Sequence, residues 1–329
     1  MSRRQDIDQI RGLAILLMVM VHAAATWMPA DASTTSVIAI VVAGLGGLAA
    51  PLFVTVGGWV TVQSKWTIRK ALTRFSFLIC AQILVNLCAP HLFDPFSPGV
   101  LSLFGILYLL APLWLHIARN VYVCTFSMLL IAILNWIVLP GDASLNWNQR
   151  NEVESAMEFV SHALLTGTYP VFPWILFSML GAALNIHTPS IKTILSGLSA
   201  GIAVSVALLV QAVNTNTPFA QPSGDAVLTF FPANTAFLVG ATTGVLILWL
   251  LLENRVPFRG LDQLGQLSLT LYVIHFVPLY IGYELATTWS VSIPLVVLYT
   301  FVWWPLGVLL RKHLPTLSLE SVLRRVSQP

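Results

Sequence analysis

Charged side chains are scarce in this chain of 329 residues, where Asp, Glu, Lys and Arg together make up 9%. Soluble domains carry roughly 25%. With an apolar share of 57%, this scarcity excludes a soluble globular protein and a disordered one. The apolar runs are continuous rather than alternating, which argues against a membrane β-barrel. The composition therefore indicates a bundle of membrane-spanning helices.

Cysteine is also rare, and several catalytic motifs are missing. Cys80, Cys88 and Cys124 all lie inside apolar runs without a CxxC spacing, so we interpret them as packing residues. The sequence contains no Walker A motif, HExxH, GxSxG or Cys/His cluster, and it therefore implies no metal. The net charge of +3 gives no reason to expect a nucleic-acid partner.

Ten apolar segments are each near the length of about 20 residues that a helix needs to cross the hydrocarbon. They run at about 9–29, 36–62, 71–89, 99–118, 121–140, 170–187, 192–213, 228–252, 263–285 and 291–310. We expect an all-α, polytopic integral membrane protein with one transmembrane domain over residues 1–329.

The basic residues predict the orientation of these helices. If the N-terminus is inside, every one of the 16 Lys and Arg residues except Arg150 falls on the inner side. This is the bias that the positive-inside rule describes. We therefore expect both termini to be cytoplasmic.

The first segment contains Arg11 and His22, and ionisable groups inside a span are rare and often functional. Eleven residues are about three helical turns, or about 16 Å, so both side chains lie on nearly the same face. Arg11 would lie at the inner mouth and His22 near the middle of the membrane. The alternative is that Arg11 extends to the interface and His22 bonds a neighbouring helix.

The ninth segment carries Ser268, Tyr272 and His275 at spacings i, i+4 and i+7, which is one helical face. Such a polar stripe predicts a wet cavity, or else a structural network of interhelical hydrogen bonds. We favour function for His275. Outer-side candidates for substrate contact are His91, Asp94 and His162, although such groups are more often merely solvated.

The loop after the second segment holds four cations in ten residues, which are Lys65, Arg69, Lys70 and Arg74. Charge density alone favours positive-inside charges near anionic lipid. The functional alternative is a cytosolic anion site, because Arg and Lys suit phosphate.

Four stretches resemble the membrane acyltransferase-3 superfamily, and most closely its branch of heparan-α-glucosaminide N-acetyltransferase and prokaryotic relatives. The stretches are Asp6–His22 with its Arg-Gly and His, Arg69-Lys70 with Arg74, Tyr169–Trp174 followed by Gly181, and Leu264–His275. Together they reach from residue 6 to about residue 280.

The resemblance implies a transmembrane acyltransferase. Members of this family move an acyl group, usually acetyl, from cytosolic acyl-CoA to an acceptor on the outer or lumenal face. Arg11 and His22 match the family's first-helix pair, Arg69 and Arg74 match positions associated with CoA, and His275 matches the late His. The implied partners are acetyl-CoA, a glycan or amino-sugar acceptor and the bilayer. The expected location is a prokaryotic plasma membrane, and a homodimer is an alternative to a monomer.

We assign Arg11, His22 and His275 to catalysis, and Arg69, Lys70, Arg74, Ser268 and Tyr272 to donor binding. The lysosomal enzyme of the resembling branch uses a lumenal His after its first helix and has an amide at the position of His22. Here the loop Trp27–Ser36 contains no His, so the base would be His22 or another residue.

A neutral His22 could act as general base or accept the acetyl group itself. The oxyanion donor could be Ser268, Tyr272 or His275. The other function class is a transporter or flippase of a polar lipid or small solute that uses the same polar cavity. A membrane scaffold without an active site is disfavoured by a mid-span His near a basic mouth.

Overall fold

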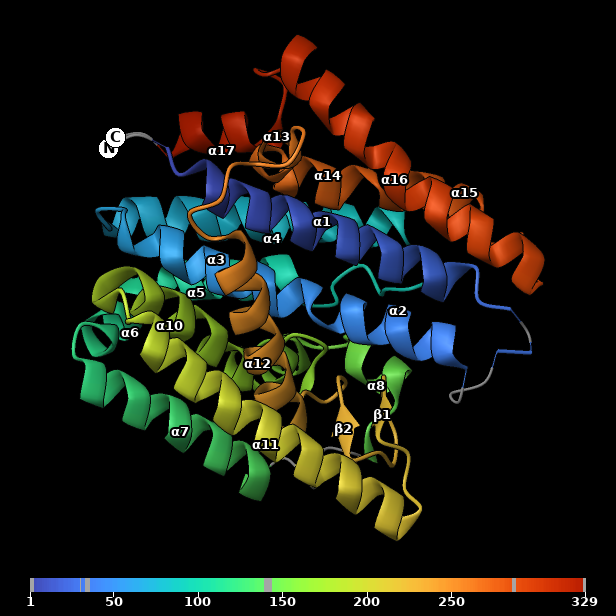
Figure 1. The fold of residues 1–329 in the computed structure, drawn as a ribbon. Helices are drawn as coiled ribbons and strands as arrows, with labels where there is room; N and C mark the ends of the chain where they lie inside the picture. Colours follow the sequence, from blue (N-terminus) through green and yellow to red (C-terminus); the bar gives the residue numbers. More distant parts are fainter. Residues whose placement is uncertain (1–2, 30, 33–35, 139–143, 286–287, 328–329) are drawn as a thin grey trace. The chain divides into compact units, whose positions relative to one another are not determined.

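The computed structural model describes residues 3–29, 31–32, 36–138, 144–285 and 288–327, and these residues are mostly α-helical (Figure 1). The strands among them are β1 (Ala220–Gln221) and β2 (Leu228–Thr229), which pair in parallel. The prediction of an all-α membrane protein is confirmed.

Seven helices within the described ranges are long and apolar enough to cross a membrane, or up to nine if two bent pairs each form one span. The seven are α1 (Gln5–Thr26), α2 (Val37–Gly47) with α3 (Ala49–Val62), α4 (Ile68–Cys88), α7 (Val121–Val138), α11 (Ile191–Thr215), α12 (Thr235–Leu252) and α16 (Trp289–His313). The bent pairs are α5 (Val100–Leu109) with α6 (Ala111–Ala118), and residues 156–166 with α10 (Val171–His187). The chain is therefore a multi-pass integral membrane protein. The count of ten crossings and the cytoplasmic termini stay predictions.

The predicted span 263–285 is not one helix. It consists of α13 (Leu261–Gln266), α14 (Ser268–Ile274) and α15 (Phe276–Ile281). The first break lies at Leu267, with φ −111° and ψ 20°. The second lies at His275, where Pro278 has no N–H to donate to the carbonyl four residues earlier. His275 consequently sits between two short helices instead of inside a long one.

Two other predicted segments also differ. The segment 99–118 bends by 75° at Leu110, where Pro112 in the first turn of α6 is suited to start a new helix. The segment 228–252 begins with β2, and its helix starts only at Thr235. Hydropathy records the length of an apolar run, but it does not record such breaks.

The chain forms two compact units. Unit 1 comprises Met1–Phe53, Leu87–Leu92 and Leu248–Pro329, and unit 2 comprises Val54–Asn86 and Phe93–Ile247. Besides α1, α2 and α13 to α16, unit 1 contains α17 (Leu319–Val326). Besides α4 to α7, α10 and α11, unit 2 contains α8 (Trp147–Asn151), α9 (Ala156–Ser161) and the π-helical turn η2 (His162–Thr166).

In unit 1, α1 packs against α13, α14 and α16 (Figure 1). Two glycines let α1 and α13 approach closely. A Cβ at Gly12 would lie 2.0 Å from the Leu261 carbonyl oxygen, and a Cβ at Gly265 would lie 1.9 Å from the Asp8 carbonyl oxygen. Small residues permit this close backbone contact between membrane helices. The glycines of the Arg-Gly and Leu-Gly motifs therefore meet each other.

Unit 2 is built around α10, which packs against α5, α6 and α7. A second pair of glycines lets α3 and α10 approach closely. A Cβ at Gly58 in α3 would meet the Ser178 carbonyl, and a Cβ at Gly181 in α10 would meet the Thr55 carbonyl. Cys124 is buried in this core. All three cysteines are free thiols.

Candidate active site

His22 and His275 form a direct hydrogen bond within unit 1. The distance from His22 Nδ1 to His275 Nε2 is 2.9 Å, although the residues are 253 positions apart in sequence. The ring planes differ by 8°, with centroids 5.1 Å apart. This is the geometry of two rings that lie edge to edge, as an N–H···N bond requires. The structure thus brings together two of the three predicted catalytic residues.

The hydrogen bonds of His275 assign the protons of this pair. His275 Nδ1 lies 3.0 Å from the Leu271 carbonyl oxygen, and since a carbonyl only accepts, Nδ1 carries a hydrogen. In a neutral imidazole the other nitrogen is then an acceptor. His275 Nε2 therefore accepts from His22 Nδ1–H. This leaves the lone pair of a neutral His22 on Nε2, available to take a proton or to attack a carbonyl.

Aromatic side chains enclose this histidine pair. The Phe276 ring lies 4.8 Å from the His22 ring and 4.1 Å from the His275 ring, centroid to centroid. The Tyr299 hydroxyl donates to the His275 carbonyl oxygen. His275 is fully buried, whereas His22 is half-buried. The arrangement holds His275 rigidly and leaves His22 as the more accessible partner.

The other predicted site residues of unit 1 lie at different distances from the histidine pair. The Tyr272 ring is 6.0 Å from the His275 ring, so these two residues of the predicted stripe lie close together, and their role stays a prediction. Ser268 is the first residue of α14, nearly two turns before His275. Arg11 pairs with the Asp8 carboxylate at 3.6 Å, at the other end of α1 from His22. A role of Arg11 or Ser268 in the chemistry stays a prediction.

Arg69, Lys70 and Arg74 lie in the first two turns of α4, in unit 2. Arg69 is exposed, and Lys70 Nζ lies 3.3 Å from the Lys65 carbonyl oxygen. The Arg74 guanidinium lies 5.3 Å from the ring centroids of both Trp66 and Tyr108. Its Nε is buried without a hydrogen-bond partner. Such an unsatisfied donor in a basic cluster fits an anionic ligand.

Trp66 and Tyr108 give this basic cluster an aromatic wall. Their rings are stacked with centroids 5.3 Å apart, and Lys70 Nζ lies 5.5 Å from the Trp66 ring centroid. The Trp66 indole donates to the Thr61 carbonyl oxygen at 3.0 Å, which fixes its orientation. The cluster thus combines cations with flat rings, a combination that can bind phosphate and a heterocyclic base together.

His91 lies in a second aromatic group, in unit 1. Its ring stacks on Tyr283 at 5.0 Å and on Tyr280 at 5.7 Å, and the two tyrosine rings are 5.7 Å apart. Both ring nitrogens of His91 lack a hydrogen-bond partner. Burial lowers the pKa of His91 below its ordinary value of 6.5, so the imidazole is neutral at pH 7. Tyr280 follows His275 by five residues, about 7.5 Å along a helix.

The other two outer-side candidates are engaged in local structure. His162 is buried in η2, where its Nδ1 lies 2.7 Å from the Thr166 hydroxyl oxygen. Asp94 accepts a hydrogen bond from the Phe96 backbone N–H at 3.1 Å. Neither arrangement points to a substrate.

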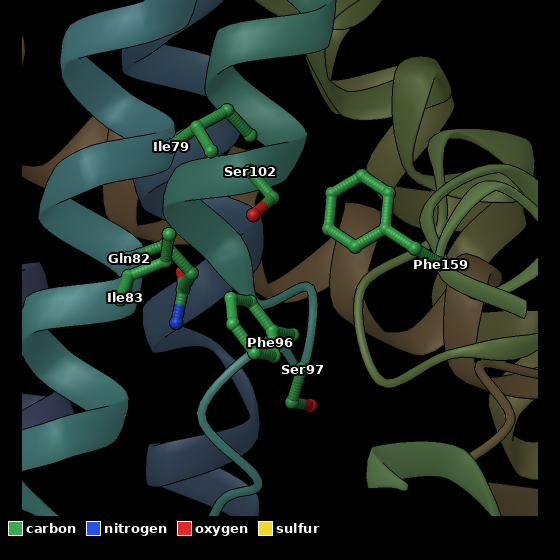
Figure 2. A pocket seen from close by; sticks show the side chains of 7 residues that line it. All are labelled: Ile79, Gln82, Ile83, Phe96, Ser97, Ser102 and Phe159. Atoms are coloured by element: carbon green, nitrogen blue, oxygen red, sulfur yellow. The ribbon is translucent and has the colours of Figure 1, made fainter. Parts of the chain in front are cut away.

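A small cavity in unit 2 lies among Ile79, Gln82, Ile83, Phe96, Ser97, Ser102 and Phe159 (Figure 2). Its volume of about 120 Å³ is below the roughly 300–1,000 Å³ of ligand pockets. The Gln82 amide beside it donates to Asn86 and accepts from the Leu101 N–H. These satisfied bonds indicate that the polar groups here hold the loop after α4 rather than a ligand.

Sequence reasoning missed the residues that surround the predicted ones. Trp66 and Tyr108 contact Arg74, and Tyr299 bonds the carbonyl of His275. Trp66 stands inside the basic loop and could have been noticed there. Tyr108 and Tyr299 lie in apolar runs where no local pattern distinguishes them.

Comparison with known proteins adds one match. The acyltransferase-3 family model, described as an acyltransferase domain, matches residues 4–312. A search of curated proteins found no significant match. The matched range includes every predicted site residue and ends before α17.

Proposed function

Because the chain belongs to the acyltransferase-3 family and is a membrane acyltransferase, we propose that it moves an acetyl group from cytosolic acetyl-CoA to a sugar-type acceptor. The acceptor would present an amine or hydroxyl on the extracytoplasmic side. The observation that carries this proposal is the His22–His275 hydrogen bond, which leaves a lone pair on His22 Nε2. The family does not favour the alternative of a transporter or flippase.

His22 supports two chemical routes. As general base, its Nε2 takes the proton of the acceptor hydroxyl or amine while the acceptor atom attacks the thioester carbonyl. The C–S bond then breaks, and the CoA thiolate receives the proton. Alternatively, Nε2 attacks the carbonyl first, the C–S bond breaks and CoA leaves as its thiolate. The acceptor then attacks the acyl-histidine, the N–C bond breaks, and the thiolate receives the acceptor's proton. In both routes His22 Nδ1–H keeps its bond to His275, which stabilises the imidazolium or acyl-imidazolium.

We place the CoA phosphates at Arg69, Lys70 and Arg74. Three features support this assignment: the concentration of cations, the unsatisfied Arg74 Nε, and the stacked Trp66 and Tyr108 rings. The phosphates would pair with the cations, and the adenine would stack on an aromatic face.

Removing two cations tests this donor site. The variant Arg69→Ala with Arg74→Ala should weaken acetyl-CoA binding by roughly ten-fold or more, because a charge-assisted hydrogen bond contributes about 1.5–3 kcal/mol. The loss should shrink at high salt. The measurement is the shift in melting temperature against acetyl-CoA concentration, with dephospho-CoA and adenosine as comparison ligands.

Arg119→Ala is the matched control, since Arg119 is an exposed cation on the predicted inner side. It should leave donor affinity unchanged. Equal acetyl-CoA affinities for the double variant and the control would show that Arg69 and Arg74 do not bind the donor and serve only as positive-inside charges. No stabilisation of the wild-type protein by acetyl-CoA at any concentration would contradict the proposed donor.

We place the sugar acceptor beside His91, Tyr280 and Tyr283. Tyr280 and Tyr283 are about 40% exposed, and stacked aromatic rings suit the apolar face of a sugar ring. The half-buried His91 ring packs against both tyrosine rings and holds them in place.

Tyr283→Ala should raise the KM for a sugar acceptor roughly two- to ten-fold, the range that one aromatic contact contributes. The KM for acetyl-CoA should not change. Steady-state kinetics with labelled acetyl-CoA checks both values. Tyr122→Ala is the control, because Tyr122 is 83% exposed on α7. If Tyr283→Ala and Tyr122→Ala give the same acceptor KM, the acceptor binds elsewhere.

The resemblance to the heparan-α-glucosaminide branch completes the proposal. Its support is the pattern Tyr169–Trp174 with Gly181, and Gly181 lies in the close contact with the Thr55 carbonyl. We propose a prokaryotic plasma membrane as the location.

A further inference from the structure

The C-terminal helix α17 lies outside the range of the family match and contacts the helix that leads to His275. Glu320 Oε1 accepts hydrogen bonds from the backbone N–H groups of Leu269 and Thr270, at 2.6 and 3.2 Å. Glu320 Oε2 accepts from the Thr270 hydroxyl at 2.6 Å. Thr270 Oγ1 in turn accepts from the Leu319 N–H at 2.9 Å. Two residues of α17 and two of α14 are therefore joined by hydrogen bonds in both directions.

These bonds matter because α14 is a weak element by itself. It has seven residues, Ser268–Ile274, and the residue before it provides no side-chain cap. A helix of this length is marginal without partners, and its first N–H groups need acceptors from outside. Glu320 supplies an acceptor with the charge that a helix N-terminus favours. The position of His275, which follows the last residue of α14, therefore depends on the hydrogen bonds that Glu320 accepts at the start of this helix.

The sequence of α17 separates apolar from basic residues. Leu319, Val322, Leu323 and Val326 follow the spacing i, i+3, i+4 and i+7, which places them on one face. No residue of this helix is buried, and Val322 and Val326 are 37% and 47% exposed. Arg324 and Arg325 stand in its last turn. Leu319 and Leu323 are half-buried, so the face is partly exposed. A partly exposed apolar face beside arginines is typical of a helix at a membrane surface.

The preceding span determines where α17 can lie. The long helix α16 ends at His313 with Arg311 and Lys312 in its last turn, and α17 begins six residues later. A connection this short reaches at most about 20 Å, so α17 stays near the membrane face at which α16 ends. The cations of both elements are then presented to the same layer of lipid headgroups.

We propose that α17 binds the surface of an anionic membrane and, through Glu320, holds the start of α14 in place. The bound partner is the layer of headgroups with net negative charge, which the arginines recognise, while the valines and leucines enter the interface. Glu320 is a positioning residue that acts on His275 through α14. Binding of anionic lipid to α17 thereby stabilises the hydrogen-bonded pair of His22 and His275.

Hydrogen exchange of the full chain tests this proposal without any acyl substrate, so its failure is distinct from failure of the proposed function. The protein is reconstituted in phosphatidylcholine with and without phosphatidylglycerol. We expect slower exchange at residues 319–326 and at 268–275 with the anionic lipid. Arg324→Gln with Arg325→Gln should weaken binding to the anionic membrane by about five-fold for each arginine, the factor that one basic side chain contributes at an anionic surface. The slowing of exchange at residues 319–326 should shrink accordingly.

Three further variants separate lipid binding from the positioning of α14. Glu320→Gln should speed exchange at Leu269 and Thr270 and lower kcat without changing either KM, and Thr270→Ser, which keeps the hydroxyl, should behave as wild type. Lys192→Gln, at an exposed cation in unit 2, should leave the lipid effect intact. Equal exchange at 319–326 in the two membranes would overturn lipid binding. Unchanged exchange at 268–275 in Glu320→Gln would overturn the positioning role.

Discussion

Replacing His22 with alanine should reduce acyl transfer by about 10²–10⁴-fold, the range that general acid–base catalysis contributes, or abolish it if an acyl-histidine is required. The substitution removes the lone pair on Nε2 but leaves α1, whose packing rests on other residues. The affinity for acetyl-CoA should stay close to wild type, and the melting temperature should fall only modestly, because the buried His275 Nε2 loses its donor. Transfer of labelled acetyl from acetyl-CoA in sealed vesicles measures the effect.

Three further variants make the interpretation specific. His22→Asn keeps an N–H that can donate to His275 Nε2, yet it has no basic nitrogen, so it should be as inactive as His22→Ala. His275→Ala leaves Nε2 on His22 but frees the ring to choose the other tautomer, so we expect a partial loss. His116→Ala, at an exposed histidine of α6, should have no effect. Wild-type transfer by His22→Ala would remove His22 from the chemistry.

The sequence identifies His22 and His275 because ionisable side chains are rare inside apolar spans. It does not show that they bond each other, because the contact joins residues 253 positions apart and depends on how α14 ends. The same limit applies to Gly12 and Gly265. Each glycine stands in a recognisable motif, but only the packed helices show that the two motifs form one contact.

The helix breaks could not be predicted from hydropathy. The run 263–285 is apolar throughout, so it has the appearance of one crossing. Pro278 is the local sequence signal for the break at His275. The sequence at Leu267 carries no such signal for the first break. Glu320 is hidden for another reason. An acidic residue in a polar C-terminal stretch appears solvated, and its role becomes visible only when the start of α14 is seen beside it.

A methyl group at Gly265 should destabilise the protein by about 1–3 kcal/mol or more, the usual cost of overpacking. The new Cβ would lie 1.9 Å from the Asp8 carbonyl oxygen and 2.9 Å from the Gly12 nitrogen. Both neighbours are backbone atoms of α1, so no side chain can rotate away. The helices α1 and α13 must move apart, and this outweighs the gain of about 0.5–1 kcal/mol that alanine brings to a helix interior.

Gly44→Ala is the matched control for this prediction, because nothing lies within 4 Å of a Cβ at Gly44 in α2. It should melt at or slightly above the wild-type temperature, while Gly265→Ala melts clearly below it in the same detergent. Because α13 leads directly into α14, separating α1 from α13 should also disturb the His22–His275 bond and lower kcat. Equal melting temperatures for the two variants would show that α1 and α13 do not approach as closely as the structure places them.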